Sequence, residues 1–324
     1  MSMGWQGVGR QGLKLLAQAS LVAGAVGALS FMLTRSLPGD AAYRIAAGRY
    51  GYDLVDTAAA DAVRSELGLD KPAGLQLIRW LGDLLQLRLG NSMVSGDLVL
   101  DEISHQLGHT LQLSLAAWLL AIVFGVLLGG WAALRASHWS TRWIDPFCTL
   151  LRASPAFLLG VMLMLVFGMH LDWLPVAGHG EARNLVIPGL ALALTLLPGM
   201  TQLVRTRLQL VLTSEVFEFA QTKGLPLRMA LWRHALAPVA LGTLAYAGMQ
   251  LVLLVEGVVV VESLMAWPGI GHALVHAVIA RDVPMIQGTA LAMGLMFVLI
   301  NGAVDAAVQW LDPRLREPAG RSLA

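Results

Sequence analysis

The sequence predicts an all-α protein that crosses a membrane six times. Of the 324 residues, 56% are hydrophobic and 13% are charged, and this charged share is about half that of a soluble domain. So few charges cannot cover the surface of a soluble enzyme, and such high hydrophobicity excludes a disordered chain. The net charge of +1 leaves no basic surface for nucleic acid. The single cysteine, Cys148, excludes an intrachain disulfide and a multi-cysteine metal site.

Six stretches without Asp, Glu, Lys, Arg or His, the third of which ends at Met169, are long enough to span a bilayer. The hydrocarbon core of a bilayer, about 30 Å thick, requires roughly 20 residues of apolar helix. The stretches are rich in Leu, Ala, Val and Gly, and their small residues let helices approach closely within lipid. The predicted spans are residues 15–34, 110–134, 153–170, 185–204, 235–255 and 283–304.

The first stretch has a second interpretation, as a cleaved signal peptide. Arg10 and Lys14 precede it, and Ala23-Gly24-Ala25 resembles a cleavage site. However, its apolar run is longer than the roughly 7–15 residues of a signal-peptide core. We therefore interpret residues 1–34 as a cytoplasmic N-terminus followed by the first membrane helix.

The distribution of basic residues predicts that both termini are cytoplasmic, because cytoplasmic loops carry an excess of Lys and Arg. In this orientation the two short outer loops hold only Arg183 and Arg281. Residues 35–109 form a long outer segment, whose charges count little because long loops are translocated regardless of charge. The cytoplasmic segments, including the tail 311–324, then hold thirteen basic residues: Arg10, Lys14, Arg135, Arg142, Arg152, Arg205, Arg207, Lys223, Arg228, Arg233, Arg314, Arg316 and Arg321.

Two outer segments are not predicted to span. Residues 35–109 carry charges, Pro and Gly and a helical pattern around 75–87, and we interpret them as a small extracytoplasmic subdomain. In the outer loop 256–282, the stretch 263–280 is uncharged but is interrupted by Pro and Gly. Irregular backbone survives at membrane depth only where protein or water satisfies it. We therefore expect a re-entrant or interfacial loop there.

Two carboxylates, Glu256 and Glu262, lie at the start of that outer loop. A carboxylate at membrane depth is costly and usually faces a cavity, so a gate is one interpretation. Solvated carboxylates at the membrane interface are the other. Asn301 in the last span is expected to form a hydrogen bond between helices.

The inner loop 205–234 is predicted to form two short helices. Ser214 can cap the first helix, with Glu215 in its first turn, where a carboxylate favours the helix dipole. Gly224 provides a left-handed stop, and Pro226 begins the second helix at the tolerated first position. An apolar surface remains on the first helix and needs a partner to cover it; it is formed by Val216, Phe217, Phe219 and Ala220.

This loop resembles a known motif. The run Glu218-Phe219-Ala220-Gln221-Thr222-Lys223-Gly224 resembles the EAA-xxx-G coupling motif of bacterial ABC-importer permeases. The continuation through Leu225-Pro226 and Arg233-His234-Ala235-Leu236-Ala237-Pro238 is similar to the dipeptide, oligopeptide and nickel permease family. Further pieces match the same family in order: Leu37-Pro38-Gly39-Asp40, Leu67-Gly68-Leu69-Asp70-Lys71-Pro72, Leu89-Gly90-Asn91-Ser92, Ala266-Trp267-Pro268-Gly269-Ile270-Gly271, Arg281-Asp282-Val283-Pro284 and Leu311-Asp312-Pro313-Arg314. Phe219, Ala41 and His272 depart from the family's usual Ala, Pro and Arg.

The resemblance implies the type I fold of ABC-importer permeases, with residues 110–310 as the permease core in a bacterial inner membrane. It implies transport of short peptides, or of nickel and small metal chelates. It also implies a second related permease, two ATP-binding subunits and an extracytoplasmic binding protein as partners. The residues that it places at the ATPase contact are Ser214, Phe217, Glu218, Phe219, Ala220, Gly224, Leu225, Arg233 and His234.

The chain itself is not expected to be an enzyme or to hold a cofactor. A phosphate-binding loop requires Gly-Lys at the end of GxxxxGK[ST], whereas Lys14, Lys71 and Lys223 follow Leu, Asp and Thr. Two other classes stay open: a secondary transporter or channel that works without ATP, and a membrane scaffold protein. The paired inner helices argue against both.

Six of the eight histidines fall on the predicted outer side: His105, His109, His170, His179, His272 and His276. Imidazoles four residues apart share one helix face, so His272 and His276 are the candidates for a metal site. No carboxylate completes a recognisable site around them, and solvated or hydrogen-bonded histidines are the simpler interpretation. We therefore predict no metal site.

Overall fold

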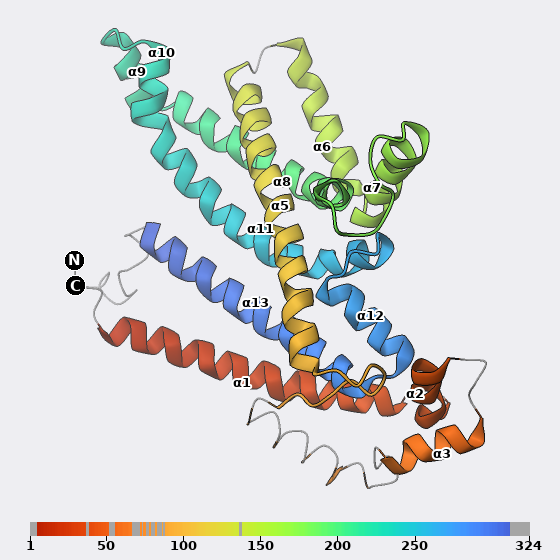
Figure 1. Cartoon of the computed structure of the whole chain (residues 1–324). Coiled ribbons are helices and arrows are strands. Elements are labelled where there is room, and N and C mark those ends of the chain that lie inside the picture. The colour runs from red at the N-terminus through yellow and green to blue at the C-terminus, as the bar shows by residue number, and fades with distance from the viewer. Residues whose placement is uncertain are drawn as a thin grey trace. The chain divides into compact units, whose positions relative to one another are not determined.

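A computed structural model of the chain describes residues 5–36, 39–51, 56–66, 72, 74–75, 78, 82, 86, 88–135 and 138–311. These residues form helices and their connections, with one isolated bridge between Asn91 and Leu98 (Figure 1). The chain divides into two compact units. Unit 1 comprises residues 1–111 and 266–299, and unit 2 comprises residues 112–265 and 300–324. The predicted all-α class is confirmed.

Five described helical stretches are long and apolar enough to cross a membrane: Gly12–Leu29, Val99–Leu134, Ala182–Leu212, Leu227–Leu254 and Val283–Gln309. They belong to α1 (Trp5–Ser36), α5 (Val99–Leu134), α8 (Val186–Leu212), α11 (Leu236–Leu264) and α13 (Val283–Leu311). A sixth candidate is a bent pair, Thr141–Ala153 with Ala156–His170. The six-span prediction is confirmed if that pair counts as one span.

The third span, predicted over 153–170, is not one continuous helix. Helix α6 (Ile144–Ala153) and helix α7 (Ala156–Leu163) are separated by a break, and the pair is bent by 105°. Ser154 is extended there, with φ −98° and ψ 120°. The reason is Pro155, which lacks an N–H and disfavours helical backbone at the residue before it. A π-helical segment, Met164–His170, then continues from α7.

The other spans continue as helix beyond their uncharged runs. Helix α5 begins at Val99, eleven residues before the predicted span, and α8 ends at Leu212, inside the predicted inner loop. Helix α11 continues to Leu264, so the first part of the predicted outer loop 256–282 is helical, Glu256 and Glu262 included. An uncharged run indicates which residues lie within the bilayer, whereas a helix continues until a capping or helix-breaking residue ends it.

Unit 1 contains the predicted extracytoplasmic helices α2 (Ala41–Tyr50) and α3 (Thr57–Glu66) and the short apolar helix α12 (Ile270–Ala280). Asp40 caps α2 by accepting from Ala42 N at 2.9 Å. Helices α2 and α3 share a small core around Ile45 and Val63, and a second core joins α12 to the first turns of α5 and α13. The helical pattern predicted around 75–87, and most of the tail 311–324, lie outside the described residues.

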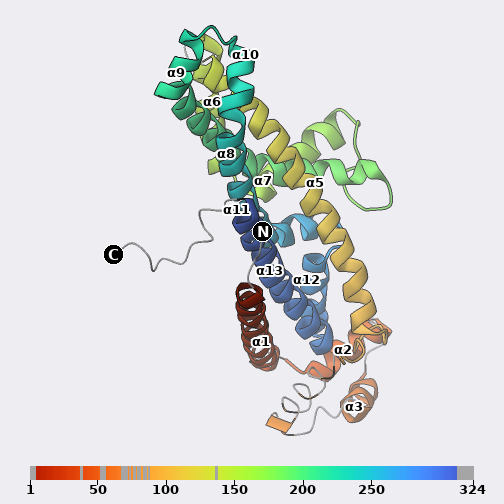
Figure 2. The same ribbon diagram turned by 90° about the vertical axis from the view of Figure 1, so that its left-hand side faces the viewer.

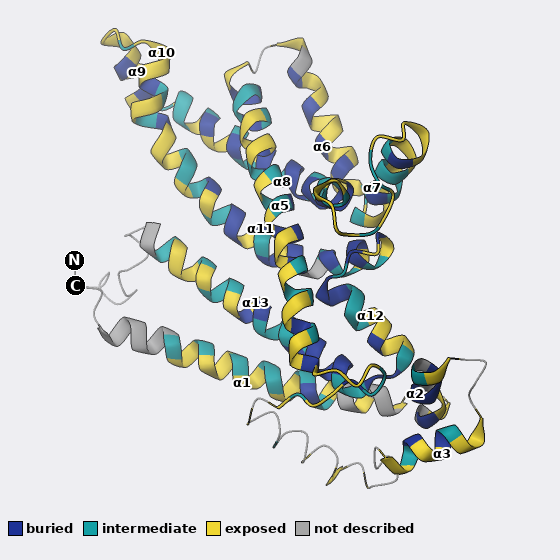
Figure 3. Cartoon of the chain, in the orientation of Figure 1, coloured by how far each residue is buried: buried dark blue, intermediate teal, exposed yellow. Residues whose placement is uncertain are grey.

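Unit 2 is built around α8, which packs against α6, α7 and α11. Glycines permit the close crossings that the small-residue content predicts. A Cβ on Gly199 would collide with Tyr246 Oη of α11, and a Cβ on Gly129 of α5 would collide with the Thr201 carbonyl oxygen of α8. Gln250 of α11 also donates from Nε2 to the carbonyl oxygen of Leu196 at 2.8 Å. Figure 3 shows the dark blue of buried residues concentrated along α8.

Candidate functional site

The predicted inner helix exists, and its first residue is capped as expected. Helix α9 covers Glu215–Thr222, and its N-cap Ser214 is extended with φ −82° and ψ 146°. Ser214 Oγ accepts from the backbone N–H of Phe217 at 3.3 Å, which satisfies one of the free donors of the first turn. Glu215 and Glu218 both lie in that first turn, where carboxylates favour the helix dipole.

The end of α9 is a Schellman motif centred on Gly224. Gly224 has φ +85°, the left-handed conformation that the sequence predicts there. The N–H of Gly224 donates to the Gln221 carbonyl at 2.8 Å, and the N–H of Leu225 donates to the Ala220 carbonyl at 3.2 Å. These two bonds satisfy carbonyls that the end of a helix would leave unpaired. The motif thereby sets the direction in which the chain leaves α9.

The second inner helix, α10, covers only Leu227–Ala230. Pro226 is the N-cap of α10, with φ −63° and ψ 145°, one residue before the first helical position that the sequence predicts for it. Residues after a proline N-cap keep their N–H groups available for the first turn. A π-helical segment, Leu231–Ala235, then joins α10 to α11. The inner element is therefore one helix, a glycine turn and a continuous approach to the next span.

Helix α9 has a buried face and an exposed apolar face. Phe217 and Ala220 are buried, with Phe217 2% exposed. Val216 and Phe219, three residues apart, are 63% and 61% exposed. Lys223 Nζ lies 4.5 Å from the centroid of the Phe219 ring, a cation–π distance. Two apolar side chains of α9 are therefore exposed beside its buried face.

The remaining predicted residues of the inner element are spread along it. Glu218 and Arg233 are exposed, whereas Leu225 and His234 are half-buried. Figures 1 and 2 show α9 and α10 side by side at one end of unit 2, where α8 ends. The nine residues predicted at the ATPase contact thus lie on one element, Ser214 to His234, with Phe217 and Ala220 turned inward.

A second cluster, in unit 1, joins three of the sequence motifs and was not predicted. Asp282 is 3% exposed and lies just before α13. Its carboxylate accepts from Ser92 Oγ, from Met93 N at 3.1 Å and from Val94 N at 3.4 Å. It also accepts from Met285 N at 3.3 Å, which caps α13. Asp282 therefore connects the segment before α5 to the start of the last span through hydrogen bonds.

Arg281 joins the third motif to this cluster. It ends α12 with the left-handed φ of +56°, and its guanidinium donates from Nη1 to the Gly39 carbonyl at 2.8 Å. A left-handed conformation costs a non-glycine residue roughly 1–2 kcal/mol. The motifs around Gly39-Asp40, Asn91-Ser92 and Arg281-Asp282 lie far apart in the sequence and meet in unit 1. In the sequence, the only indication of these contacts is that each motif carries charged or polar residues next to the end of a predicted span.

The histidine pairs lie together as their spacing predicts. Ring centroids are 4.8 Å apart for His105 and His109 of α5, and 4.4 Å apart for His272 and His276 of α12. Burial, and after it the neighbouring His276, lowers the pKa of His272 below its ordinary value. Among the described residues, no group of three or more His, Cys, Asp or Glu side chains could hold a metal ion.

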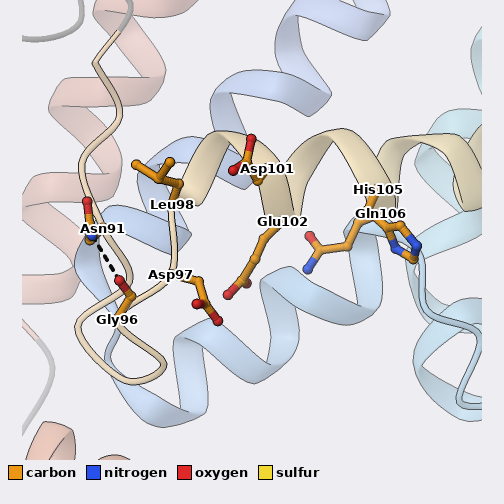
Figure 4. A pocket seen from close by; sticks show the side chains of 8 residues that line it. All are labelled: Asn91, Gly96, Asp97, Leu98, Asp101, Glu102, His105 and Gln106. Atoms are coloured by element: carbon orange, nitrogen blue, oxygen red, sulfur yellow. Dashed lines mark hydrogen bonds between the residues drawn. The ribbon is translucent and has the colours of Figure 1, made fainter.

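A hollow of about 640 Å³ lies beside the first turns of α5. Its lining includes the acidic residues Asp97, Asp101 and Glu102 together with His105 and Gln106; in Figure 4, Asp97 and Glu102 point to one side of the helix and Asp101 points to the other. Glu102 already accepts from Ser95 Oγ at 2.8 Å, and Asn91 Nδ2 donates to the Gly96 carbonyl at 2.8 Å. These two hydrogen bonds connect residues that line the hollow with the loop before α5.

Comparison with known proteins identifies the family of the chain. Residues 125–317 match the family described as the binding-protein-dependent transport system inner membrane component. The chain belongs to this family. It is thus a permease subunit of an ABC importer, and neither a secondary transporter or channel nor a scaffold is favoured. The predicted membership in the ABC-importer permeases is confirmed.

Similar proteins cover nearly the whole permease. A Brucella abortus protein named as a peptide transport system permease is 34% identical over 312 residues, which are 94% of this chain and 98% of that protein. The glutathione transport system permease of Salmonella paratyphi A is 33% identical over 295 residues, covering 90% and 94% of the two chains. A glutathione transport system permease of Pectobacterium atrosepticum is 35% identical over 292 residues, covering 89% and 92%.

Among solved structures, the permease resembles a chain of the MetNI methionine ABC transporter in an inward-facing conformation. The TM-score is 0.52 at 16% identity, and the match covers 65% of this chain and 96% of that one. This likeness shows the fold alone. It supports the expected fold of an ABC-importer permease.

Proposed function

We propose that this permease forms part of the path by which an ATP-driven importer moves short peptides into a bacterial cell. The support is its likeness to a peptide transport permease over 94% of its length and to permeases of glutathione, which is itself a small peptide. These names favour peptides over nickel and small metal chelates, the other substrates that the sequence leaves open. The partners in this proposal are a second related permease, two ATP-binding subunits and an extracytoplasmic binding protein.

Within this function, α9 and the Gly224 turn are the element that receives ATPase movement. The observation that carries this role is the exposed pair Val216 and Phe219 on a helix stabilised at both ends. A helix that transmits force must keep its direction under load, and the Ser214 cap and the Gly224 motif provide this. Glu218, Leu225, Arg233 and His234 complete the contact surface in this proposal.

Reconstitution with separate subunits tests the proposed function. The purified permease should neither bind nor hydrolyse ATP, because no lysine follows a glycine in its sequence. Peptide uptake into vesicles should appear only when the permease pair, the ATP-binding subunits and the binding protein are combined. Hydrolysis by this chain alone, or uptake without ATP, would contradict the proposal.

Labelling tests the proposed orientation, in which both termini and residues 205–234 are cytoplasmic. A cysteine at Val216, which is 63% exposed, should resist an impermeant thiol reagent applied to intact cells and react after the cells are opened. The background variant is Cys148→Ala, which removes the only native thiol. A cysteine at Asp61, whose side chain is 68% exposed on the predicted outer segment, is the matched control and should react from outside. The reverse labelling pattern would mean that residues 205–234 lie outside the cell and residues 35–109 lie inside.

Alanine at both His272 and His276 should leave peptide transport largely unchanged. Neither residue belongs to the Asp282 cluster, and among the described residues they complete no group suited to a metal ion. The measurement is uptake of a peptide and of Ni²⁺ by the reconstituted importer. A loss confined to Ni²⁺, with assembly unchanged, would assign the pair to a metal path instead.

A further inference from the structure

An apolar groove of about 990 Å³ lies in unit 2 beside the inner element. We name it the inner groove; its walls come from α5, α8, α10, the π-helical segment Leu231–Ala235 and the first turns of α11. Gly130 of α5 and Val239 of α11 line it, and Trp232 stands at its edge with 75% of its surface exposed. Apart from Arg228 and Thr243, its lining side chains are apolar. The groove is open rather than enclosed.

The walls of the inner groove belong to candidate membrane spans. Val99–Leu134, Ala182–Leu212 and Leu227–Leu254 each contribute lining residues. In the orientation proposed above, the walls from Ile122–Leu134 of α5 and Leu236–Leu244 of α11 lie within predicted spans and face hydrocarbon, whereas Arg228 and Trp232 lie in the inner loop beside them. An acyl chain is therefore the natural occupant of the groove in the bilayer.

Arg228 adds a charged group to the lining of the inner groove. It is the one charged residue of the lining, it is exposed, and no ion pair involves it within the described ranges. Trp232 lies four residues further on, and tryptophan favours the level of lipid headgroups. A guanidinium pairs with phosphate through two parallel hydrogen bonds. The inner groove, apolar with an arginine in its lining, therefore suits a lipid whose acyl chain is joined to a phosphate headgroup.

We propose that the inner groove binds an anionic phospholipid, with one acyl chain along α5 and α11 and the phosphate on Arg228. In the orientation proposed above, this lipid belongs to the cytoplasmic leaflet, whose anionic lipids attract basic residues. The lipid contacts α10 directly, one turn after the Gly224 motif. It therefore stabilises the junction through which α9 is connected to α11.

Native mass spectrometry of the assembled, delipidated transporter tests this binding. The probes are phosphatidylglycerol and phosphatidylcholine with identical acyl chains. We expect the wild type to retain phosphatidylglycerol preferentially. Arg228→Gln should weaken this retention about fivefold, because one basic residue contributes that much near an anionic lipid surface, and should leave phosphatidylcholine retention unchanged. Arg152→Gln, which removes an exposed charge on the same predicted side, is the matched control and should have no effect.

A second variant tests the apolar part of the site. A Cβ on Gly130 would meet nothing within 4 Å, so Gly130→Leu fills the inner groove without a collision at that atom. It should reduce the retention of both lipids. Gly108→Leu, in the same helix and equally unobstructed at Cβ, is the control and should retain both.

Three results would overturn the proposal: equal phosphatidylglycerol retention in all variants, retention by the isolated permease that is lost in the full transporter, and displacement of the lipid by peptide substrate. The second result would assign the groove to a partner subunit, and the third to the transport path. Because the readout is lipid retention, it is independent of whether α9 transmits ATPase movement.

Discussion

Replacing Gly224 with valine is expected to abolish transport while the permease still reaches the membrane at a near-normal level. Gly224 has φ +85°, and a residue with a Cβ pays roughly 1–2 kcal/mol for that conformation, more when it is β-branched. The space around the residue is open, with nothing within 4 Å of a built Cβ, so the effect is conformational rather than a collision. The turn would relax to another conformation, and α10 would then leave α9 in a different direction.

Two further variants separate this explanation from a general loss of folding. Gly224→Asn should keep most of the transport activity, because asparagine tolerates the left-handed conformation. Glu218→Ala should be mild, since an exposed carboxylate at an interface rim contributes about 1 kcal/mol or less. The measurements are peptide uptake and copurification of the ATP-binding subunits for each variant. Wild-type uptake in Gly224→Val would mean that this loop does not couple the ATPase to transport.

The sequence predicts local features of the inner element well because each depends on one residue and its neighbours. Ser214 is the predicted cap, and Gly224 is the predicted left-handed stop. Both follow from backbone geometry within one turn. The spans are equally local, since about 20 uncharged apolar residues decide each one.

Features that depend on distant residues were not predicted. Ser92 and Asp282 lie 190 positions apart, and no pattern in one chain states that they share a hydrogen bond. The 105° bend at Pro155 falls inside an apolar run, and hydropathy alone does not distinguish a straight span from one that a proline breaks. Some helices also extend beyond the predicted spans, as at Val99 and Leu264. Hydropathy indicates which residues lie in the bilayer, and not where the backbone hydrogen bonds of a helix begin or end.

Replacing Asp282 with alanine is expected to destabilise unit 1 and to lower transport in proportion. The carboxylate is 3% exposed and accepts from Ser92, Met93, Val94 and Met285. Its removal takes the cap from α13 and leaves buried donors unpaired. A lost cap costs about 1 kcal/mol and each unsatisfied buried donor about 1–3 kcal/mol, so we expect a loss of at least about 3 kcal/mol.

The expected readout is a thermal unfolding midpoint several degrees below that of the wild type, measured on the purified permease, together with reduced uptake. Asp282→Asn should be intermediate, because its one amide oxygen can still accept while its NH₂ faces donors. Asp61→Ala is the control and should leave the midpoint unchanged, since the side chain of Asp61 is 68% exposed and pairs with Arg64 at the surface. If Asp282→Ala unfolds at the wild-type temperature, the three motifs do not stabilise one another through this carboxylate. The meeting of Gly39, Ser92 and Asp282 would then have to be explained by a contact with another subunit.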